Sequence, residues 1–314
     1  MSTKNNLKNN NILIVILGPT AIGKTDFAIK LAKQVNGEII SADSRTVYQQ
    51  MNIGTAKPSS SQRKLIPHYL LDVRRPDQIF TVAEFKKQAL RIIQDIQSHG
   101  KIPFLVGGTG LYISAIVNNL SVPQIAPDKK LRKKLEVYIK KYGLKKLYAK
   151  LIKLDPEAKE FIDPKNPRRI IRAIEVYLKT KQKFSQLRQS GQPLFRTLQI
   201  GLNLPRHKLY EKINNRTDQM IKSGLIKETQ RLMKKYSPNL PSMSGIGYKQ
   251  IRLYLKNKIS LPIAIELIKR DTRRYAKRQL TWFKRDKNIR WLVSDDAARA
   301  KKIIKNFIKR EINK

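Results

Sequence analysis

Gly18-Pro-Thr-Ala-Ile-Gly-Lys-Thr25 is the stretch that decides the fold. It follows the continuous apolar run Ile12 to Leu17 and precedes a segment of helical periodicity, Asp26 to Val35. This order of strand, glycine-rich turn and helix is that of a phosphate-binding loop. The backbone N–H groups of such a loop and the side chain of Lys24 attract phosphate oxygens, and Thr25 offers a hydroxyl to a phosphate-bound Mg²⁺. The sequence therefore predicts that the chain binds a phosphorylated small molecule.

Further apolar runs predict a parallel sheet around this loop. They are Glu38 to Ser41, Tyr69 to Val73, Ile102 to Val106, Gln199 to Leu204 and Arg290 to Val293. Helical patterns lie between them. Thr81 and Glu84 form a capping box that opens a helix with the apolar stripe Val82, Phe85, Ala89, Ile92 and Ile96. We expect an α/β fold, a parallel sheet of the P-loop NTPase type flanked by helices, with the phosphate loop at the carboxyl end of the first strand.

The pattern changes at about Leu120, and Lys129 to Tyr177 reads as helices until strand character returns near Gln199. This predicts an all-helical lobe inserted into an α/β core. The expected domains are the first part of the core at 1–119, the lobe at 120–198, and the second part of the core at 199–314. In that last part, Lys208 to Lys235 and Leu261 to Arg285 are basic and helical, before a short terminal strand.

The composition indicates a polyanionic partner. The 314 residues contain 66 Lys+Arg against 23 Asp+Glu, a net charge of +43. Compositional drift in an AT-rich genome is the alternative explanation for part of this charge. There are 0 Cys and 3 His, which fits a reducing compartment and gives no sign of a metal centre. Residues 1–11 lack the apolar core of a secretion signal and no apolar run has membrane-spanning length, so we expect a cytoplasmic protein with no membrane partner.

Two polar residues follow expected strands at the edge where the phosphate loop opens. Asp43 ends the second apolar run, where its carboxylate could orient Mg²⁺, accept a proton or simply cap the next helix. Thr109, within Gly107 to Gly110, could contact substrate or belong only to a tight turn. Asp72 could be a Walker-B carboxylate or a turn residue, and the sequence does not decide between these roles.

Basic residues form rows on two expected helices. Arg168 and Arg172 lie one turn apart, and seven cations from Lys269 to Lys284 surround Tyr275 and Trp282, which are interpreted as core residues. Such rows suit a nucleic-acid backbone, whereas a solvated charged face is the alternative. Arg216 is expected near the start of a helix that continues through Gly224 and Leu225, as a surface cation if nothing else engages it.

Seven segments together resemble the bacterial tRNA dimethylallyltransferase family, also called tRNA isopentenyltransferases. They are the phosphate loop, Ser-Ala-Asp-Ser-Arg-x-Val-Tyr, Asn-Ile-Gly-Thr-Ala-Lys-Pro, Val-Gly-Gly-Thr-Gly-Leu-Tyr, Ile-Arg-Ala-Ile-Glu-Val-Tyr, Gly-Ile-Gly-Tyr-Lys-Gln and Ala-Lys-Arg-Gln-Leu-Thr-Trp-Phe. They occur in family order between about Ile12 and Trp291. The resemblance implies transfer of the dimethylallyl group from dimethylallyl diphosphate to N6 of adenosine 37 in the tRNA anticodon loop, with release of diphosphate.

The resemblance also implies the roles of individual residues. Asp43 would be the general base, and Mg²⁺, Lys24, Arg216 and the loop amides would stabilise the departing diphosphate. The donor site would comprise Gly18, Pro19, Thr20, Ala21, Ile22, Gly23, Lys24 and Thr25. The tRNA-binding residues would be Asp43, Ser44, Arg45, Thr46, Thr109, Arg168, Arg169, Arg172, Lys249, Arg273, Lys277, Arg278 and Gln279. The lobe would close on the anticodon stem, and the protein is expected to be a monomer.

The sequence departs from the family pattern at two of these positions. Thr46 stands where the family commonly has Gln, which puts a contact with the target base or its neighbour in doubt. Ile22 replaces a usually small residue of the loop, where its side chain need not approach the phosphates. The Cys-rich finger of some eukaryotic relatives has no counterpart among these residues.

Three other functions share parts of this signature. A free-nucleotide isopentenyltransferase would use the same loop and aspartate on AMP, without need of the lobe or the basic helices. A P-loop kinase would use the loop on ATP, but the weak Walker-B signal disfavours it. A non-catalytic RNA-binding protein would have no need of intact Lys24, Thr25 and Asp43.

Overall fold

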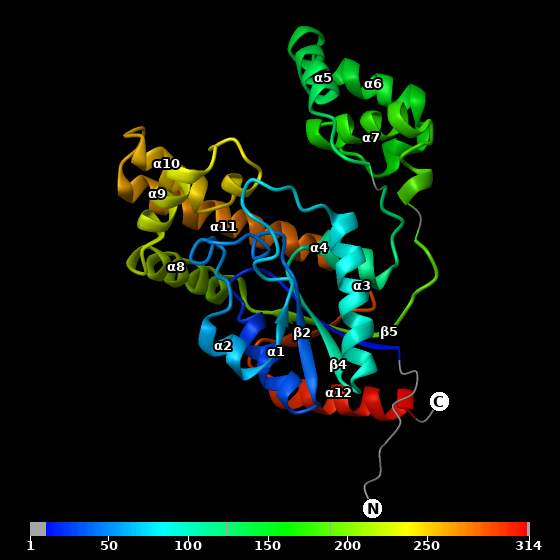
Figure 1. Ribbon diagram of the computed structural model, residues 1–314, viewed down its shortest axis with the longest axis vertical. Coiled ribbons are helices and arrows are strands. Elements are labelled where there is room, and N and C mark those ends of the chain that lie inside the picture. Colours follow the sequence, from blue (N-terminus) through cyan, green and yellow to red (C-terminus); the bar gives the residue numbers. More distant parts are fainter. Residues whose placement is uncertain (1–10, 124, 189, 313–314) are drawn as a thin grey trace, which may run out of the picture. The chain divides into compact units, whose positions relative to one another are not determined.

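A six-stranded parallel sheet forms the centre of the α/β core (Figure 1). The computed structural model describes residues 11–123, 125–188 and 190–312. Residues 1–10, in which the sequence predicts no targeting segment, lie outside the described part. The strand order is β3-β2-β4-β1-β5-β6. The bounds are β1 Ile12–Leu17, β2 Gly37–Ala42, β3 His68–Tyr69, β4 Ile102–Gly107, β5 Arg196–Asn203 and β6 Arg290–Val293. The expected α/β fold is confirmed.

Strand β1 lies in the middle of the sheet, between β4 and β5, and all its residues are buried. Its side chains alternate between two cores. Leu13, Val15 and Leu17 join one core with α3 (Val82–Ser98) and α4 (Gly110–Val117). The other residues of β1 join a second core with α1 (Lys24–Lys33) and α12 (Ala297–Ile312). Burial on both faces explains why this strand reads as a continuous apolar run.

The strand expected at Tyr69 to Val73 is shorter and starts one residue earlier: β3 comprises only His68–Tyr69. Leu70 and Asp72 have φ angles of 60° and 57°. These are left-handed conformations that do not continue a strand. The chain instead turns toward α2 (Ser60–Leu65) and its neighbours, where Asp72 pairs with Lys57 and Arg63. Asp72 is therefore a structural residue, and its Walker-B alternative is set aside.

The capping box at the start of α3 is confirmed, because Thr81 Oγ1 accepts from the Glu84 N–H and Glu84 accepts from the Thr81 N–H. Its apolar stripe differs by one position. Ile93 is fully buried, whereas Ile92, which the stripe predicted, is only partly buried. Spacing of four residues from Ala89 directs Ile93 toward the sheet.

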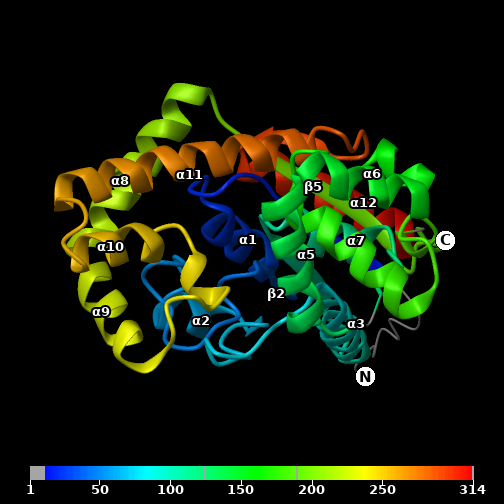
Figure 2. The same cartoon turned by 90° about the horizontal axis from the view of Figure 1, so that it is seen from above.

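After β5 the chain forms a layer of helices, seen from above in Figure 2, in which α11 packs against both α8 and α10. The bounds are α8 Arg206–Lys222, α9 Leu225–Lys235, a 3₁₀ turn at Ser242–Ser244, α10 Tyr248–Leu255 and α11 Leu261–Phe283. The expectation of one helix running through Gly224 is wrong, because Gly224 has a φ of 99° and separates α8 from α9. Beyond β6 lies α12, the last helix of the described chain, where the sequence pattern predicted no helix.

The described residues divide into two compact units, 11–117 with 194–312, and the described part of 118–193. The second unit contains α5 (Lys129–Tyr142), α6 (Leu144–Leu154), α7 (Pro167–Thr180) and two short 3₁₀ helices, Pro156–Glu160 and Gln186–Arg188. Its core includes Leu147, Leu151, Ile170 and Ile174. The end expected for the lobe, residue 198, lies inside β5, because strand pairing with β1 already begins at Arg196. Within the described ranges, no helix has the length and apolar character of a membrane span.

Candidate active site

The phosphate loop connects β1 to α1 through two glycines. Gly18 and Gly23 have φ angles of 148° and 93°, a region that glycine adopts without strain. At Gly18 an added Cβ would also lie 2.8 Å from the carbonyl oxygen of Leu202. Because α1 begins at Lys24, its first N–H groups are available beside the loop. The backbone thus has the form of an anion site, as the sequence predicted.

Lys24 is folded against its own loop. Its Nζ donates to the carbonyl oxygen of Pro19 at 2.7 Å. Burial lowers the pKa of Lys24 to about 8; the nearby Asp43 opposes this effect and Arg216 adds to it. An anion beside Nζ would favour the charged form. The amine is therefore available to pair with a phosphate group.

Arg216 brings a second cation to the loop from the middle of α8. Its terminal nitrogen donates to Thr20 Oγ1 at 2.6 Å. Burial lowers the pKa of Arg216, and Asp43 opposes the shift. The alternative of a surface cation at a helix start is therefore wrong, because α8 already begins at Arg206 and brings Arg216 to the loop. The role at the diphosphate that the resemblance implied for Arg216 stays a prediction.

Asp43 follows β2 directly, at the carboxyl edge of the sheet. Its Oδ1 accepts from the Arg45 N–H at 2.8 Å. The segment after Asp43 is a turn, so the helix-capping alternative is wrong, although the residue does stabilise local structure. Asp43 lines one cavity together with Lys24 and Arg216, and its charge opposes the lowering of the pKa of both cations.

Thr109 joins the glycine-rich turn after β4 to the turn after Asp43. Its Oγ1 accepts from the Ser44 N–H at 3.0 Å, and its own N–H donates to the Ala42 carbonyl at 3.1 Å. An added Cβ at Gly107 would lie 2.1 Å from that same carbonyl oxygen. The close approach requires glycine, which explains this part of the motif. Substrate contact by Thr109 stays a prediction.

Gln279 lies on α11 and binds the two glycine-rich turns together. Its Oε1 accepts from the Thr20 N–H at 2.9 Å, and its Nε2 donates to the Gly108 carbonyl at 2.8 Å. Only 6% of the residue is exposed. These contacts assign Gln279 to the support of the loop, where the resemblance had implied a tRNA contact.

Two cavities meet at the loop. The loop cavity, of about 440 Å³, is lined by Lys24, Thr25 and other residues of α1. The helical cavity, of about 390 Å³, is lined by residues of α8 and α11, among them Met220, Ile268 and Tyr275. Four residues line both: Thr20, Asp43, Thr55 and Arg216. A carboxylate and a guanidinium are therefore shared by the two spaces.

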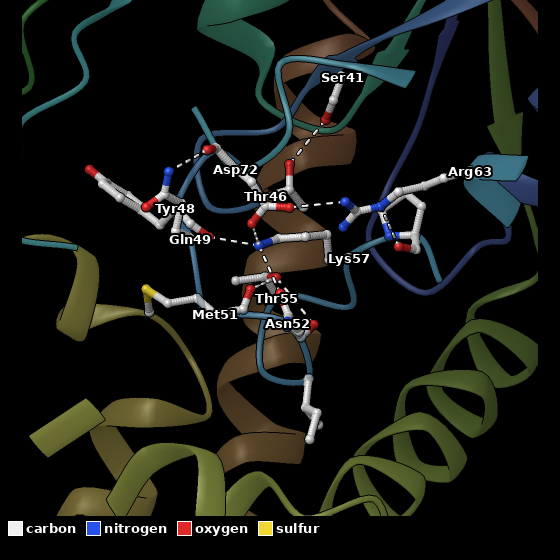
Figure 3. Close-up of polar contacts among 12 residues, drawn as sticks. Ser41, Thr46, Tyr48, Gln49, Met51, Asn52, Thr55, Lys57, Arg63 and Asp72 are labelled. Carbon is white, nitrogen blue, oxygen red and sulfur yellow. Dashed lines mark hydrogen bonds and ion pairs between the residues drawn. The ribbon is translucent and has the colours of Figure 1, made fainter. Parts of the chain in front are cut away.

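The turn after Asp43 is held within the protein. Thr46 is 5% exposed, and its hydroxyl bonds that of Ser41 at 3.0 Å (Figure 3). Arg45 donates to the carbonyl oxygens of Pro241 and Ser242 at 2.6 and 3.3 Å. These contacts favour a structural role for Thr46 and Arg45 over the tRNA contacts that the resemblance implied. Ser44 lines the helical cavity.

The other predicted tRNA-binding residues divide into exposed and engaged side chains. Arg168, Arg169, Lys249, Lys277 and Arg278 are exposed. Arg273 is partly buried and donates to Asn214 Oδ1 at 3.0 Å. Tyr275 is partly buried on α11 and lines the helical cavity, so its interpretation as a core residue is incomplete. Trp282 packs against the core, as predicted.

Arg172 is engaged inside the second unit, so its interpretation as part of a free cationic row is wrong. It donates to Glu175 at 2.7 Å and to the Ile125 carbonyl at 3.0 Å. Glu175 also accepts from Arg132 and from the Asp128 N–H. Burial would raise the pKa of Glu175, but the hydrogen bonds of the two arginines hold it at about 2.

The site also contains residues that the sequence analysis did not single out. Thr55 lines both cavities, and Glu228 and Lys57 hold the turn that carries it. In the sequence, only their place in the motif Asn-Ile-Gly-Thr-Ala-Lys-Pro pointed to Thr55 and Lys57. Nothing in the sequence pointed to Glu228, because a single Glu on an amphipathic helix reads as a solvated residue.

The donors for a magnesium ion are few but suitable. No group of three His, Cys, Asp or Glu side chains in the described ranges is arranged for a metal. Thr25 and Asp43 both line the loop cavity. Mg²⁺ commonly binds one or two protein oxygens together with substrate phosphates and waters, so these residues fit such an ion.

Comparison with known proteins identifies the family. The model of the IPP transferase family matches residues 46–286. The chain belongs to the IPP transferase family. This range begins after the phosphate loop, but individual members of the family match a larger share of the chain. A tRNA dimethylallyltransferase of Acetivibrio thermocellus is 47% identical, over 94% of this chain and 96% of that protein. One from Halothermothrix orenii is 48% identical, over 92% of this chain and 89% of that protein.

Solved structures of IPP transferases share the fold. The full-length tRNA isopentenylpyrophosphate transferase of Bacillus halodurans has a TM-score of 0.71 and 40% identity, with 97% of each chain covered. A eukaryotic dimethylallyltransferase, described as acting on tRNA, has a TM-score of 0.78 and 28% identity, covering 95% of this chain and 80% of that one.

Proposed function

We propose that this IPP transferase transfers the dimethylallyl group of dimethylallyl diphosphate to N6 of adenosine 37 in tRNA and releases diphosphate. The observation that carries the proposal is the sharing of Thr20, Asp43 and Arg216 by two cavities. A diphosphate held on the loop side and an amine on the helical side would meet at these residues. Such a meeting point needs positive charge for the leaving group and a base for the nucleophile.

The donor binds with its diphosphate in the loop cavity. Loop N–H groups, Lys24 and Arg216 contact the phosphate oxygens, which gain negative charge as the allylic C–O bond breaks. Their fixed positions stabilise that charge without reorganisation. Thr25 would offer its hydroxyl to a magnesium ion, which supplies further positive charge to the diphosphate when bound.

The acceptor is the exocyclic amine of an adenine that has left the stack of the anticodon loop. Asp43 accepts a proton from N6 as the new C–N bond forms. Because such an amine is a poor nucleophile, alignment of N6 with the allylic carbon in the helical cavity supplies much of the acceleration. The products are the N6-substituted adenosine and free diphosphate.

The tRNA is bound through its phosphates by exposed cations. They are Arg168 and Arg169 of the second unit and Lys249, Lys277 and Arg278 of the first, together with the partly buried Arg273. The net charge of +43 agrees with an RNA partner. The protein acts as a monomer in the cytoplasm, on the anticodon stem-loop.

The test uses purified protein, magnesium and isotope-labelled dimethylallyl diphosphate, with tRNA or AMP as acceptor. We expect mass spectrometry of digested tRNA to find one five-carbon unit on adenosine 37, and AMP to remain unmodified. Label on AMP alone would make the protein a free-nucleotide transferase. If the protein hydrolyses ATP or transfers its phosphate, and leaves dimethylallyl diphosphate unused, it is a kinase.

A further inference from the structure

The turn formed by residues 52–57 lies at the junction of the two cavities. Gly54 lines the helical cavity, Ala56 lines the loop cavity, and Thr55 between them lines both. Of the other three residues shared by the cavities, Asp43 and Arg216 already have roles in the proposed function, and the hydroxyl of Thr20 accepts a hydrogen bond from Arg216. Thr55 is therefore the shared residue whose side chain has neither a proposed role nor a bond to another residue of the junction.

The hydroxyl of Thr55 is oriented by its own turn. Oγ1 donates to the Met51 carbonyl at 2.6 Å, with the Asn52 carbonyl 3.3 Å away. A hydroxyl has one hydrogen and two lone pairs, so the hydrogen is used within the turn. The oxygen of Thr55 can then serve a ligand only as a hydrogen-bond acceptor.

On one side the 52–57 turn is held by Glu228 of α9, which is 5% exposed. Its carboxylate accepts from the N–H groups of Asn52, Ile53 and Gly54 at 2.9 to 3.1 Å. It also accepts from the Tyr248 hydroxyl at 2.7 Å. An added Cβ at Gly54 would lie 2.5 Å from the Tyr248 ring, so the contact requires glycine.

On the other side the same turn is held by Lys57, whose side chain is 1% exposed (Figure 3). Its Nζ donates to the Tyr48 carbonyl at 2.7 Å, to Asn52 Oδ1 at 2.9 Å and to Asp72 Oδ1 at 2.5 Å. Burial lowers the pKa of Lys57, and the bond to Asp72 opposes the shift. Burying a charge is costly unless its hydrogen bonds are complete, and the three bonds of Lys57 therefore constrain the turn.

We propose that Thr55 accepts a hydrogen bond from the acceptor amine, and that Glu228 and Lys57 are positioning residues that hold it there. This deepens the proposed function and rests on it. The exocyclic amine has two N–H groups. Asp43 removes the proton of one as the C–N bond forms and the C–O bond breaks, while the other N–H donates to Thr55 Oγ1 and remains on the product. Two acceptors fix the nitrogen so that its lone pair faces the allylic carbon.

The test is the single-turnover rate of dimethylallyl transfer at saturating tRNA and donor. Thr55→Val removes the acceptor and keeps the shape, and we expect the rate constant to fall by about tenfold, the loss of one hydrogen bond, with tRNA affinity unchanged. Thr55→Ser keeps the oxygen and should retain most of the rate. Thr281→Val is the matched control. Its hydroxyl also bonds the carbonyl four residues earlier, that of Lys277, but on an exposed surface.

Glu228→Gln tests the positioning role. We expect it to lower the same rate constant without changing tRNA affinity, and to add little to Thr55→Val, because both changes disturb one interaction. A Thr55→Val protein at the wild-type rate, or equal losses in Thr55→Val and Thr55→Ser, overturns the role of Thr55. Fully additive losses overturn the positioning role of Glu228. A wild-type protein that transfers nothing to tRNA overturns the proposed function as well.

Discussion

Arg168 and Arg172 lie one turn apart on α7 but differ in their surroundings. We predict that removal of Arg172 lowers the stability of the second unit, whereas removal of Arg168 weakens the binding of tRNA. Glu175 is fully buried and accepts from Arg132, Arg172 and the Asp128 N–H. Arg172→Ala removes one bond to this carboxylate and one to the Ile125 carbonyl. Both bonds are donated by a charged guanidinium, and bonds with a charged partner contribute about 1.5–3 kcal/mol each, so we expect a destabilisation of about 3 kcal/mol, the lower end of their sum.

Burial would raise the pKa of Glu175 from its ordinary value of 4.5, but its hydrogen bonds hold it at about 2. A lowered carboxyl pKa contributes stability that is present above pH 4.5 and is lost as the pH falls toward 2. Because Arg172→Ala raises this pKa, the acid unfolding of the second unit should move to higher pH.

Urea unfolding of the full chain followed by two probes measures the effect. Both tryptophans, Trp282 and Trp291, belong to the first unit, so their fluorescence reports on that unit alone. Far-ultraviolet circular dichroism also detects the helices of the second unit. Arg172→Ala should add an early transition in circular dichroism that tryptophan fluorescence does not follow.

Arg168→Ala is the control on the same helix. We expect its unfolding free energy to lie within about 0.5 kcal/mol of wild type. We also expect its tRNA affinity to depend less on salt: the slope of the logarithm of the binding constant against the logarithm of the salt concentration should shrink by about 0.7–0.9 for one lost phosphate contact. If Arg172→Ala unfolds like wild type and lowers the salt slope as Arg168→Ala does, the structural role assigned to Arg172 is refuted.

Three further predictions concern the loop and its neighbours. Asp43→Ala should lower the single-turnover rate by about 10²–10⁴-fold with little change in tRNA affinity, and an unchanged rate would exclude it as the base. Because the pKa of Lys24 is about 8, its charge is lost above that pH. Calorimetric affinity for inorganic diphosphate should therefore fall as the pH rises through 8, more steeply than in Lys24→Met. Gln279→Ala leaves the Thr20 N–H and the Gly108 carbonyl without their bonds and should lower the unfolding free energy by about 2 kcal/mol in urea titration, whereas a neutral effect would contradict its supporting role.

Local chemistry determined much of this protein before any fold was known. Ile12 to Leu17 read as a buried strand because both of its faces are covered, and Gly18 and Gly23 marked the turn because glycine adopts their φ angles without strain. The capping box at Thr81 depends only on residues three apart. Asp43 was found because the carboxyl ends of parallel strands meet at one edge.

Tertiary structure alone decided which polar side chains face the cavities and which hold the protein together. Arg172 and Gln279 have the same chemistry as residues that bind nucleic acid, but their partners Glu175, Thr20 and Gly108 use that capacity inside the fold. Glu228 reaches Gly54 across 174 positions of sequence, a distance over which no periodicity carries information. Hydrogen-bond capacity is a property of the residue, whereas the partner that uses it depends on how distant segments pack.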